Sequence, residues 1–142
     1  MRIGRGAGYA MVAMMSIARQ TNHGSAVATA TAQQIATQTG LPVEYLRKVL
    51  QRLSHARLVC SERGRTGGFR LSRAARRITL LDVVEAIEGP VDDLAMLDDT
   101  IFHARDGATL KSLRRWRHHA AGELREILNR TSLADVLSQN GA

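Results

Sequence analysis

Apolar side chains recur every three or four positions along much of this chain, which is the spacing of helices that bury one face. The first such stretch runs from about Gly6 to Gln20 and includes Tyr9, Val12 and Ile17. Small and polar residues from Asn22 to Thr29 interrupt the pattern, as a connecting loop does. The chain is therefore expected to begin with one helix followed by a loop.

Two shorter helices joined by a tight turn are predicted next. Thr31 and Gln34 have the spacing of a capping box, in which each side chain accepts the other residue's backbone N–H. This predicts a helix over Ala32–Thr39. Gly40 suits the left-handed conformation that ends a helix, and Pro42 suits the first turn of the next one. Four apolar positions share one face of that second helix: Leu46, Val49, Leu50 and Leu53. Its other face is mostly basic, so the pair is a candidate helix-turn-helix.

The pattern then changes to that of a β-hairpin. The predicted strands are Leu58–Ser61 and Phe69–Ser72, and the glycine-rich turn Glu62–Gly68 joins them. A hairpin directly after a helix-turn-helix is the arrangement of a wing. Arg63 and Arg65 lie in its turn, and a narrow minor groove attracts such charges.

The rest of the chain predicts three more helices and an acidic segment. Thr79 caps a helix that ends at Gly89, and the segment 90–107, with five aspartates, is either a loop or a short irregular helix. A long helix over Ala108–Asn129 and a short one over Ser132–Leu137 follow. The fold class is therefore mainly α with a small β-hairpin: a winged helix-turn-helix domain plus C-terminal helices, to which the family resemblance given below assigns dimerisation.

Length, charge and cysteine content narrow the class of protein. The chain has 142 residues, enough for one ordinary domain or a small domain with a dimerisation element. Residues 1–78 carry 13 lysines and arginines against two acids, a net +11, whereas residues 79–142 carry 7 against 11, a net −4. The basic part has the electrostatic pattern of a protein that binds a phosphate backbone. No apolar run approaches the roughly 18 residues of a membrane span, and a single cysteine suits a reducing compartment. We expect a cytoplasmic protein that binds no membrane.

The order of these motifs resembles one family of regulators. The motifs are Leu41-Pro42-x-x-Tyr45-Leu46, Arg63-Gly64-x-x-Gly67-Gly68-Phe69 and Ile78-Thr79-Leu80-Leu81-Asp82-Val83-Val84. In this order they are similar to the bacterial winged-helix repressors of the IscR, NsrR and CymR family, and the similarity covers essentially the whole chain. The resemblance implies a homodimer that binds double-stranded DNA at a palindromic operator. It assigns residues 1–78 to DNA binding and residues 79–142 to a linker helix, the acidic segment and dimerisation.

Both predicted surfaces can be assigned to residues. Eight of the thirteen basic residues of the first part lie between Arg47 and Arg73, around one helix and one hairpin. The candidate DNA-binding residues are Thr31, Gln33, Tyr45, Arg47, Lys48, Arg52, Arg63, Gly64, Arg65, Gly67 and Gly68. The candidate dimerisation residues form an apolar stripe on the long helix and are Leu113, Trp116, Ala120, Leu124 and Ile127.

The sensing chemistry of the family does not carry over to this chain. The best-known members hold an iron–sulfur cluster through three cysteines, and the corresponding segment here, residues 90–113, contains none. The resemblance places Lys111 and Arg114 where IscR has a cysteine and a histidine ligand, and Gly8 where NsrR has an aspartate ligand. We therefore expect no cofactor and no metal site.

The sequence leaves several alternatives open for the signal that controls this protein. The acidic segment 90–107 is an alternative docking surface for a regulatory protein, as the resemblance to cluster-free CymR suggests, and a small-molecule effector is also open. Cys60 is an alternative redox sensor if Arg63 or Arg70 lowers the pKa of its thiol. His103 and Asp106 are three positions apart, a spacing that would place both on one helix face and suits a metal, although solvated side chains are the simpler interpretation. No spacing of nucleophile, base or paired carboxylates indicates an enzyme.

Overall fold

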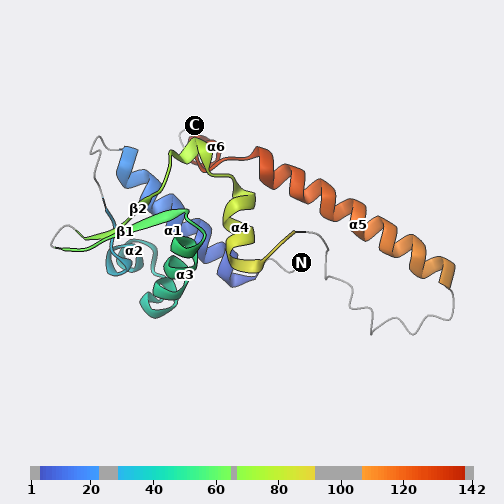
Figure 1. The fold of residues 1–142 in the computed structure, drawn as a ribbon, viewed down its shortest axis with the longest axis horizontal. Coiled ribbons are helices and arrows are strands. Elements are labelled where there is room, and N and C mark those ends of the chain that lie inside the picture. The colour runs from blue at the N-terminus through green and yellow to red at the C-terminus, as the bar shows by residue number, and fades with distance from the viewer. Residues whose placement is uncertain (1–3, 23–28, 65–66, 92–106, 140–142) are drawn as a thin grey trace.

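The computed structural model describes residues 4–22, 29–64, 67–91 and 107–139. Within these ranges the protein is mainly helical with one antiparallel hairpin, which confirms the expected fold class. The elements are α1 (Arg5–Asn22), α2 (Ala32–Thr39), α3 (Val43–His55), β1 (Val59–Glu62), β2 (Gly68–Leu71), the 3₁₀ turn η1 (Ala75–Arg77), α4 (Leu80–Glu88), α5 (Gly107–Arg130) and α6 (Leu133–Gln139). Figure 1 shows α1 to α4 and the hairpin gathered into one body, from which α5 extends.

Reciprocal hydrogen bonds start two of the helices where the sequence predicts them. Thr31 Oγ1 accepts the Gln34 amide at 3.1 Å, and Gln34 Oε1 accepts the Thr31 amide at 2.9 Å. Thr79 and Asp82 form the same box at the start of α4, with bonds of 3.0 and 2.9 Å. Each box satisfies backbone N–H groups that have no partner inside the helix.

One apolar core joins α1, α2, α3, the hairpin and α4. Helix α1 runs through it and contributes Ala10, Ala13, Met14 and Ile17, none of which has exposed surface. Leu46, Leu50 and Leu53 of α3 are equally buried. Burying a leucine side chain contributes about 1.5–3 kcal/mol, so this face of α3 fixes the helix to the body and leaves its other face outward.

The hairpin is shifted by one residue from its predicted strands and has an additional neighbour. Glu62 pairs with Gly68 at the tip end of the two strands. On the other edge of β2, Ala30 and Phe69 exchange backbone hydrogen bonds of 2.9 and 2.8 Å. A Cβ atom on Gly68 would lie 2.8 Å from the carbonyl carbon of Ala30. This close approach of two backbones requires glycine at position 68.

Helix α5 is attached to the body through its second half. Leu128 and the partly buried Leu124 pack with Leu81 and Val84 of α4, whereas no residue from position 107 to 120 is buried. Figure 1 shows the same arrangement, with only the C-terminal end of α5 near the other helices. Of the helices in the described ranges, none is long and apolar enough to cross a membrane.

The packing does not separate the chain into two parts at residue 78. Helix α4 contacts α1 and α3, and α6 contacts α1 and η1. Val83 and Leu133 belong to the same core as α1. The division into residues 1–78 and 79–142 therefore stays a prediction about function.

Candidate nucleic-acid interface

Helix α3 has a buried apolar face and an exposed polar face. Its exposed positions include Glu44, Arg47, Lys48 and Gln51. The helix follows α2 through a short turn at Gly40, where φ is +73°. In a helix-turn-helix the second helix lies in the major groove, with its first residues at the base edges. The exposed face of α3 has the position and charge that such contacts require.

Arg47 is paired within α3 by a weak contact. Its Nε atom lies 3.5 Å from Glu44 Oε1, and the two side chains are 58% and 84% exposed. Exposed ion pairs of this kind contribute little to stability. The guanidinium can therefore exchange this carboxylate for a base edge or a phosphate at small cost.

Tyr45 and Arg52 are turned toward neighbouring helices. The Tyr45 ring packs edge-on against Tyr9 of α1, with ring centroids 5.0 Å apart, and Tyr45 remains 40% exposed. Arg52 Nη1 donates to the carbonyl oxygen of Ile87 at 3.2 Å, near the end of α4 where the helix dipole favours a cation. Both residues hold α3 against α1 and α4, and their contact with DNA stays a prediction.

The start of α2 contains two of the predicted DNA contacts, Thr31 and Gln33. Thr31 uses its hydroxyl to cap the helix, whereas Gln33 is exposed in the first turn. Backbone phosphates favour this end of a helix because its N–H groups point outward. Gln33 is thus the better placed of the two predicted α2 contacts for a phosphate.

The tip of the wing presents charge and glycine together. Arg63 and Gly64 are exposed, and Gly64 adopts a φ of +113°. The Gly67 amide donates to the Gly64 carbonyl at 2.9 Å, which closes the turn. A Cβ atom on Gly67 would lie 2.7 Å from the Glu62 carbonyl oxygen. Arg65, the other predicted tip residue, lies outside the described residues.

A cross-strand ion pair stabilises the wing behind its tip. Arg70 Nε donates to Glu62 Oε1 at 2.6 Å. This hydrogen bond, followed by the charges of Cys60 and Glu62, raises the pKa of Arg70 above its usual value. Cys60 is half-buried and faces Arg70 across the hairpin. Its role as a redox sensor stays a prediction.

The apolar stripe of α5 divides into two parts. Trp116 and Ile127 are 56% and 47% exposed, and Leu113 and Ala120 are partly exposed. Leu124 instead packs toward α4 in its own chain. Contiguous exposed apolar surface on a helix marks an interaction site, so the uncovered part of the stripe is the candidate dimer surface.

Some predicted features lie outside the described residues, and some observed contacts were not predicted. His103 and residues 92–106 of the acidic segment are outside the described ranges. Within those ranges no group of three or more His, Cys, Asp or Glu could hold a metal ion. The sequence did not predict the ion pair between Arg73 and Asp82, because Asp82 was already explained as a helix cap. The glycine at position 68 was the one signal of a close backbone approach.

Comparison with known proteins identifies the relatives of this chain. Residues 3–139 match the model of the Rrf2 family, described as iron-dependent transcriptional regulators. A protein of Mycobacterium tuberculosis named as an HTH-type transcriptional regulator is 35% identical over 139 residues, which cover 96% of this chain and 81% of that protein. The regulator CymR of Bacillus subtilis is 28% identical over 138 residues, covering 97% and 91% of the two chains.

Solved structures agree with this assignment. The structure of B. subtilis CymR, described as the global cysteine regulator, has a TM-score of 0.76 at 26% identity and covers 98% of both chains. The IscR structure from T. potens has a TM-score of 0.72 at 24% identity, covers 99% of this chain and 88% of its own, and supports the fold. These relatives are transcriptional regulators and not enzymes. The chain described here belongs to the Rrf2 family of bacterial transcriptional regulators, with a winged helix-turn-helix fold.

Proposed function

We propose that this protein is a homodimeric repressor that binds a palindromic DNA operator without an iron–sulfur cluster. Helix α3 enters the major groove, and the tip of the wing enters the adjacent minor groove. Residues 1–78 supply the contacts to DNA, and residues 79–142 supply the dimer contacts. A two-fold dimer presents two copies of α3, so its operator is an inverted repeat with half-sites about 34 Å apart or a multiple of that distance.

The observation that carries this proposal is the separation of two exposed surfaces. Arg47, Lys48 and Arg63 are exposed on α3 and the wing, whereas Trp116 and Ile127 are the exposed large apolar residues of α5. The basic surface suits a phosphate backbone, and the apolar surface suits a second protein chain. A dimer joined through α5 keeps both basic surfaces accessible.

The donor set of this chain does not fit an iron–sulfur cluster, although the family is described as iron-dependent. Such clusters are held mainly by several cysteine thiolates. The sequence contains one cysteine, and Cys60 faces Arg70 in the wing. An iron–sulfur cluster therefore has no part in the proposed mechanism.

Selection of bound sequences from a random DNA pool tests the proposal. The wild type is expected to recover an inverted repeat, with binding that weakens steeply with salt as phosphate contacts release counterions. Arg47→Ala should relax the preference at one position of each half-site, since a bidentate arginine–guanine contact gives about 1–3 kcal/mol of discrimination. Arg130→Ala, which removes the same charge at the end of α5, should leave the recovered motif unchanged.

One result would contradict this proposal, and another would contradict only the base contact assigned to Arg47. Recovery of no motif by the wild type would exclude sequence-specific binding. Recovery of the same motif by wild type and Arg47→Ala would mean that Arg47 contacts phosphate or solvent only.

A further inference from the structure

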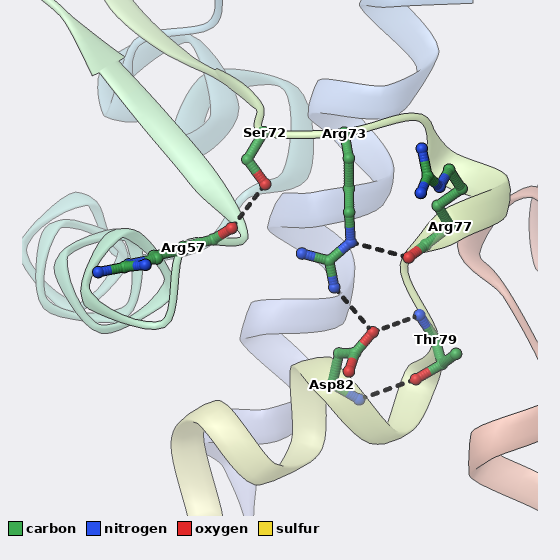
Figure 2. A network of polar contacts seen from close by, with 6 residues as sticks. All are labelled: Arg57, Ser72, Arg73, Arg77, Thr79 and Asp82. Atoms are coloured by element: carbon green, nitrogen blue, oxygen red, sulfur yellow. Dashed lines mark hydrogen bonds and ion pairs between the residues drawn. The ribbon is translucent and has the colours of Figure 1, made fainter.

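Polar contacts tie the end of the wing to the start of α4 (Figure 2). Arg73 follows the wing directly; its Nε donates to the Arg77 carbonyl oxygen at 2.8 Å, and its Nη2 donates to Asp82 Oδ2 at 3.1 Å. The same carboxylate oxygen accepts the Thr79 amide at 2.9 Å. One guanidinium thus connects the segment leaving β2 with the first turn of α4.

Other contacts hold the wing at its base and along one edge. The Ser72 amide donates to the Leu58 carbonyl at 3.0 Å, and the Ser72 hydroxyl donates to the Arg57 carbonyl at 2.6 Å. Phe69 is bonded to Ala30 on the side of α2. These bonds join the hairpin to neighbouring backbone, whereas the Arg73 side chain joins it to α4.

The start of α4 is itself firmly anchored. The Leu80 amide donates to the Thr131 carbonyl, and the Leu133 amide donates to the Ile78 carbonyl, both at 2.9 Å. Through these bonds the residues around Asp82 are joined to the connection between α5 and α6. Arg73 therefore links the wing to the part of the chain that carries the proposed dimer helix.

The length of the wing makes its angle at the base important. The two hydrogen bonds between Phe69 and Ala30 hold the wing between its base and its tip, so a shift of Arg73 would rotate the hairpin about that contact. Phe69 and Arg73 are four residues apart, or roughly 13 Å at about 3.3 Å per residue, so a shift of about 2 Å at Arg73 would rotate the hairpin by about 9°. Arg63 lies two residues past Ser61, the partner of Phe69. The same rotation would move it by about 1 Å, enough to break a hydrogen bond to DNA.

We infer that Arg73 is a positioning residue that sets the angle of the wing for the minor groove, through Asp82 and the Arg77 carbonyl. This inference rests on the proposed binding of DNA by α3 and the wing. Arg73 and Asp82 side chains are 35% and 38% exposed, so the charge pair alone contributes little to stability. Two hydrogen bonds from one planar guanidinium are directional, however, and they restrict orientation.

A double-mutant cycle on operator binding tests the inference. Arg63→Ala and Arg47→Ala are each measured in the wild-type background and in the Arg73→Ala background. We expect the loss caused by Arg63→Ala to be smaller by at least about threefold in the Arg73→Ala background, as for coupled residues. The loss caused by Arg47→Ala should agree between backgrounds within about twofold, as for independent sites.

Arg76→Ala is the matched control for Arg73→Ala. It removes one positive charge from the exposed side of η1, and we expect no coupling to Arg63. Arg73→Lys should restore part of the coupling, because an ammonium keeps the charge pair but lacks the planar fork. Thermal unfolding of each variant checks that it is folded, and Arg73→Gln replaces Arg73→Ala if the latter unfolds.

The outcomes separate this inference from the proposed function. Equal losses from Arg63→Ala in both backgrounds would overturn the positioning role while leaving DNA binding intact. Equal coupling of Arg73 to Arg47 and to Arg63 would also overturn it, because a general structural role affects both. Absence of sequence-specific binding by the wild type would overturn the proposed function and, with it, this inference. Absence of any effect of Arg63→Ala in the wild-type background would overturn the proposed role of the wing and, again, this inference.

Discussion

Helices α1 and α5 differ in which surface covers their apolar residues. Helix α1 has a central row of residues with no exposed surface, because α2, α3, α4 and the hairpin surround it. Helix α5 has no buried residue in its first half, and Trp116 stands 56% exposed. Both helices have the same apolar period in the sequence. Periodicity therefore predicts that a face will be covered, but not whether the same chain covers it.

The largest loss of stability is expected when a side chain in the buried core around α1 is truncated. Leu50 of α3 is fully buried, so Leu50→Ala should lower the free energy of unfolding by about 2–5 kcal/mol through lost contacts and a cavity. Urea unfolding measures the change. Val12→Ala on α1, where Val12 is 40% exposed, is the control, and an equal loss in both variants would contradict the burial described here.

Truncation of an exposed apolar residue on α5 should weaken the association of two chains and leave folding unchanged. Trp116→Ala removes the most exposed large apolar residue of α5, and truncation of a central aromatic residue typically costs an interface about 2 kcal/mol or more. Analytical ultracentrifugation should show weaker dimers, while the melting temperature of the monomer stays unchanged. Leu128→Ala is the opposite control, because Leu128 packs on α4 and should lower stability directly. A fully dimeric Trp116→Ala protein would place the dimer surface elsewhere.

Local sequence signals predicted the helices well because their ends are set by nearby residues. The Thr31–Gln34 and Thr79–Asp82 boxes each satisfy their hydrogen bonds within four residues, so no knowledge of the fold is needed. The apolar face of α3 follows in the same way from its period.

The positions of the strands and the orientation of several site residues depend on distant parts of the chain. The strand pairing of Phe69 with Ala30 joins residues 39 positions apart. The neighbouring glycine at position 68 indicates a close approach but does not indicate which segment makes it. Arg52 had the same local signal as Arg47, a cation on the polar side of α3. It differs because the end of α4 lies within reach of Arg52, which only the packing determines.

A smaller effect on stability is expected where the wing meets the body. Gly68 has a φ of +148°, and a Cβ atom there would lie 2.8 Å from the Ala30 backbone. Gly68→Ala should therefore destabilise the protein by about 1–3 kcal/mol, the usual cost of a strained backbone. Gly8→Ala on α1 has open space around its Cβ and should instead stabilise the helix by roughly 0.5–1 kcal/mol. Thermal unfolding distinguishes these opposite signs, and a stabilising Gly68→Ala would contradict the close approach.

The smallest effect concerns the short helix α6, beside the attached end of α5. The backbone and then the hydroxyl of Ser132 donate to Asp135 and lower the pKa of that carboxyl below its usual value. Because the folded pKa is the lower one, the stabilisation is complete above the unfolded value of about 3.9 and disappears as the pH falls through the folded pKa. Asp135→Asn should therefore lower the melting temperature slightly at pH 7 and not at the acid end. Glu126→Gln, on the exposed face of α5, controls for the loss of one negative charge, and a pH-independent effect of Asp135→Asn would contradict the linkage.

The junction between α3 and β1 has a consequence for the spacing of the operator. Arg57 adopts a φ of +60°, and the Leu58 amide donates to the Leu53 carbonyl at 2.9 Å, so the strand leaves the helix without a flexible linker. A DNA duplex turns by roughly 34–36° for each base pair. If α3 and the wing bind as proposed, one base pair inserted between their contacts would rotate one contact out of phase with the other. The affinity would then depend on the number of base pairs between the two contacts as well as on the base sequence of the operator.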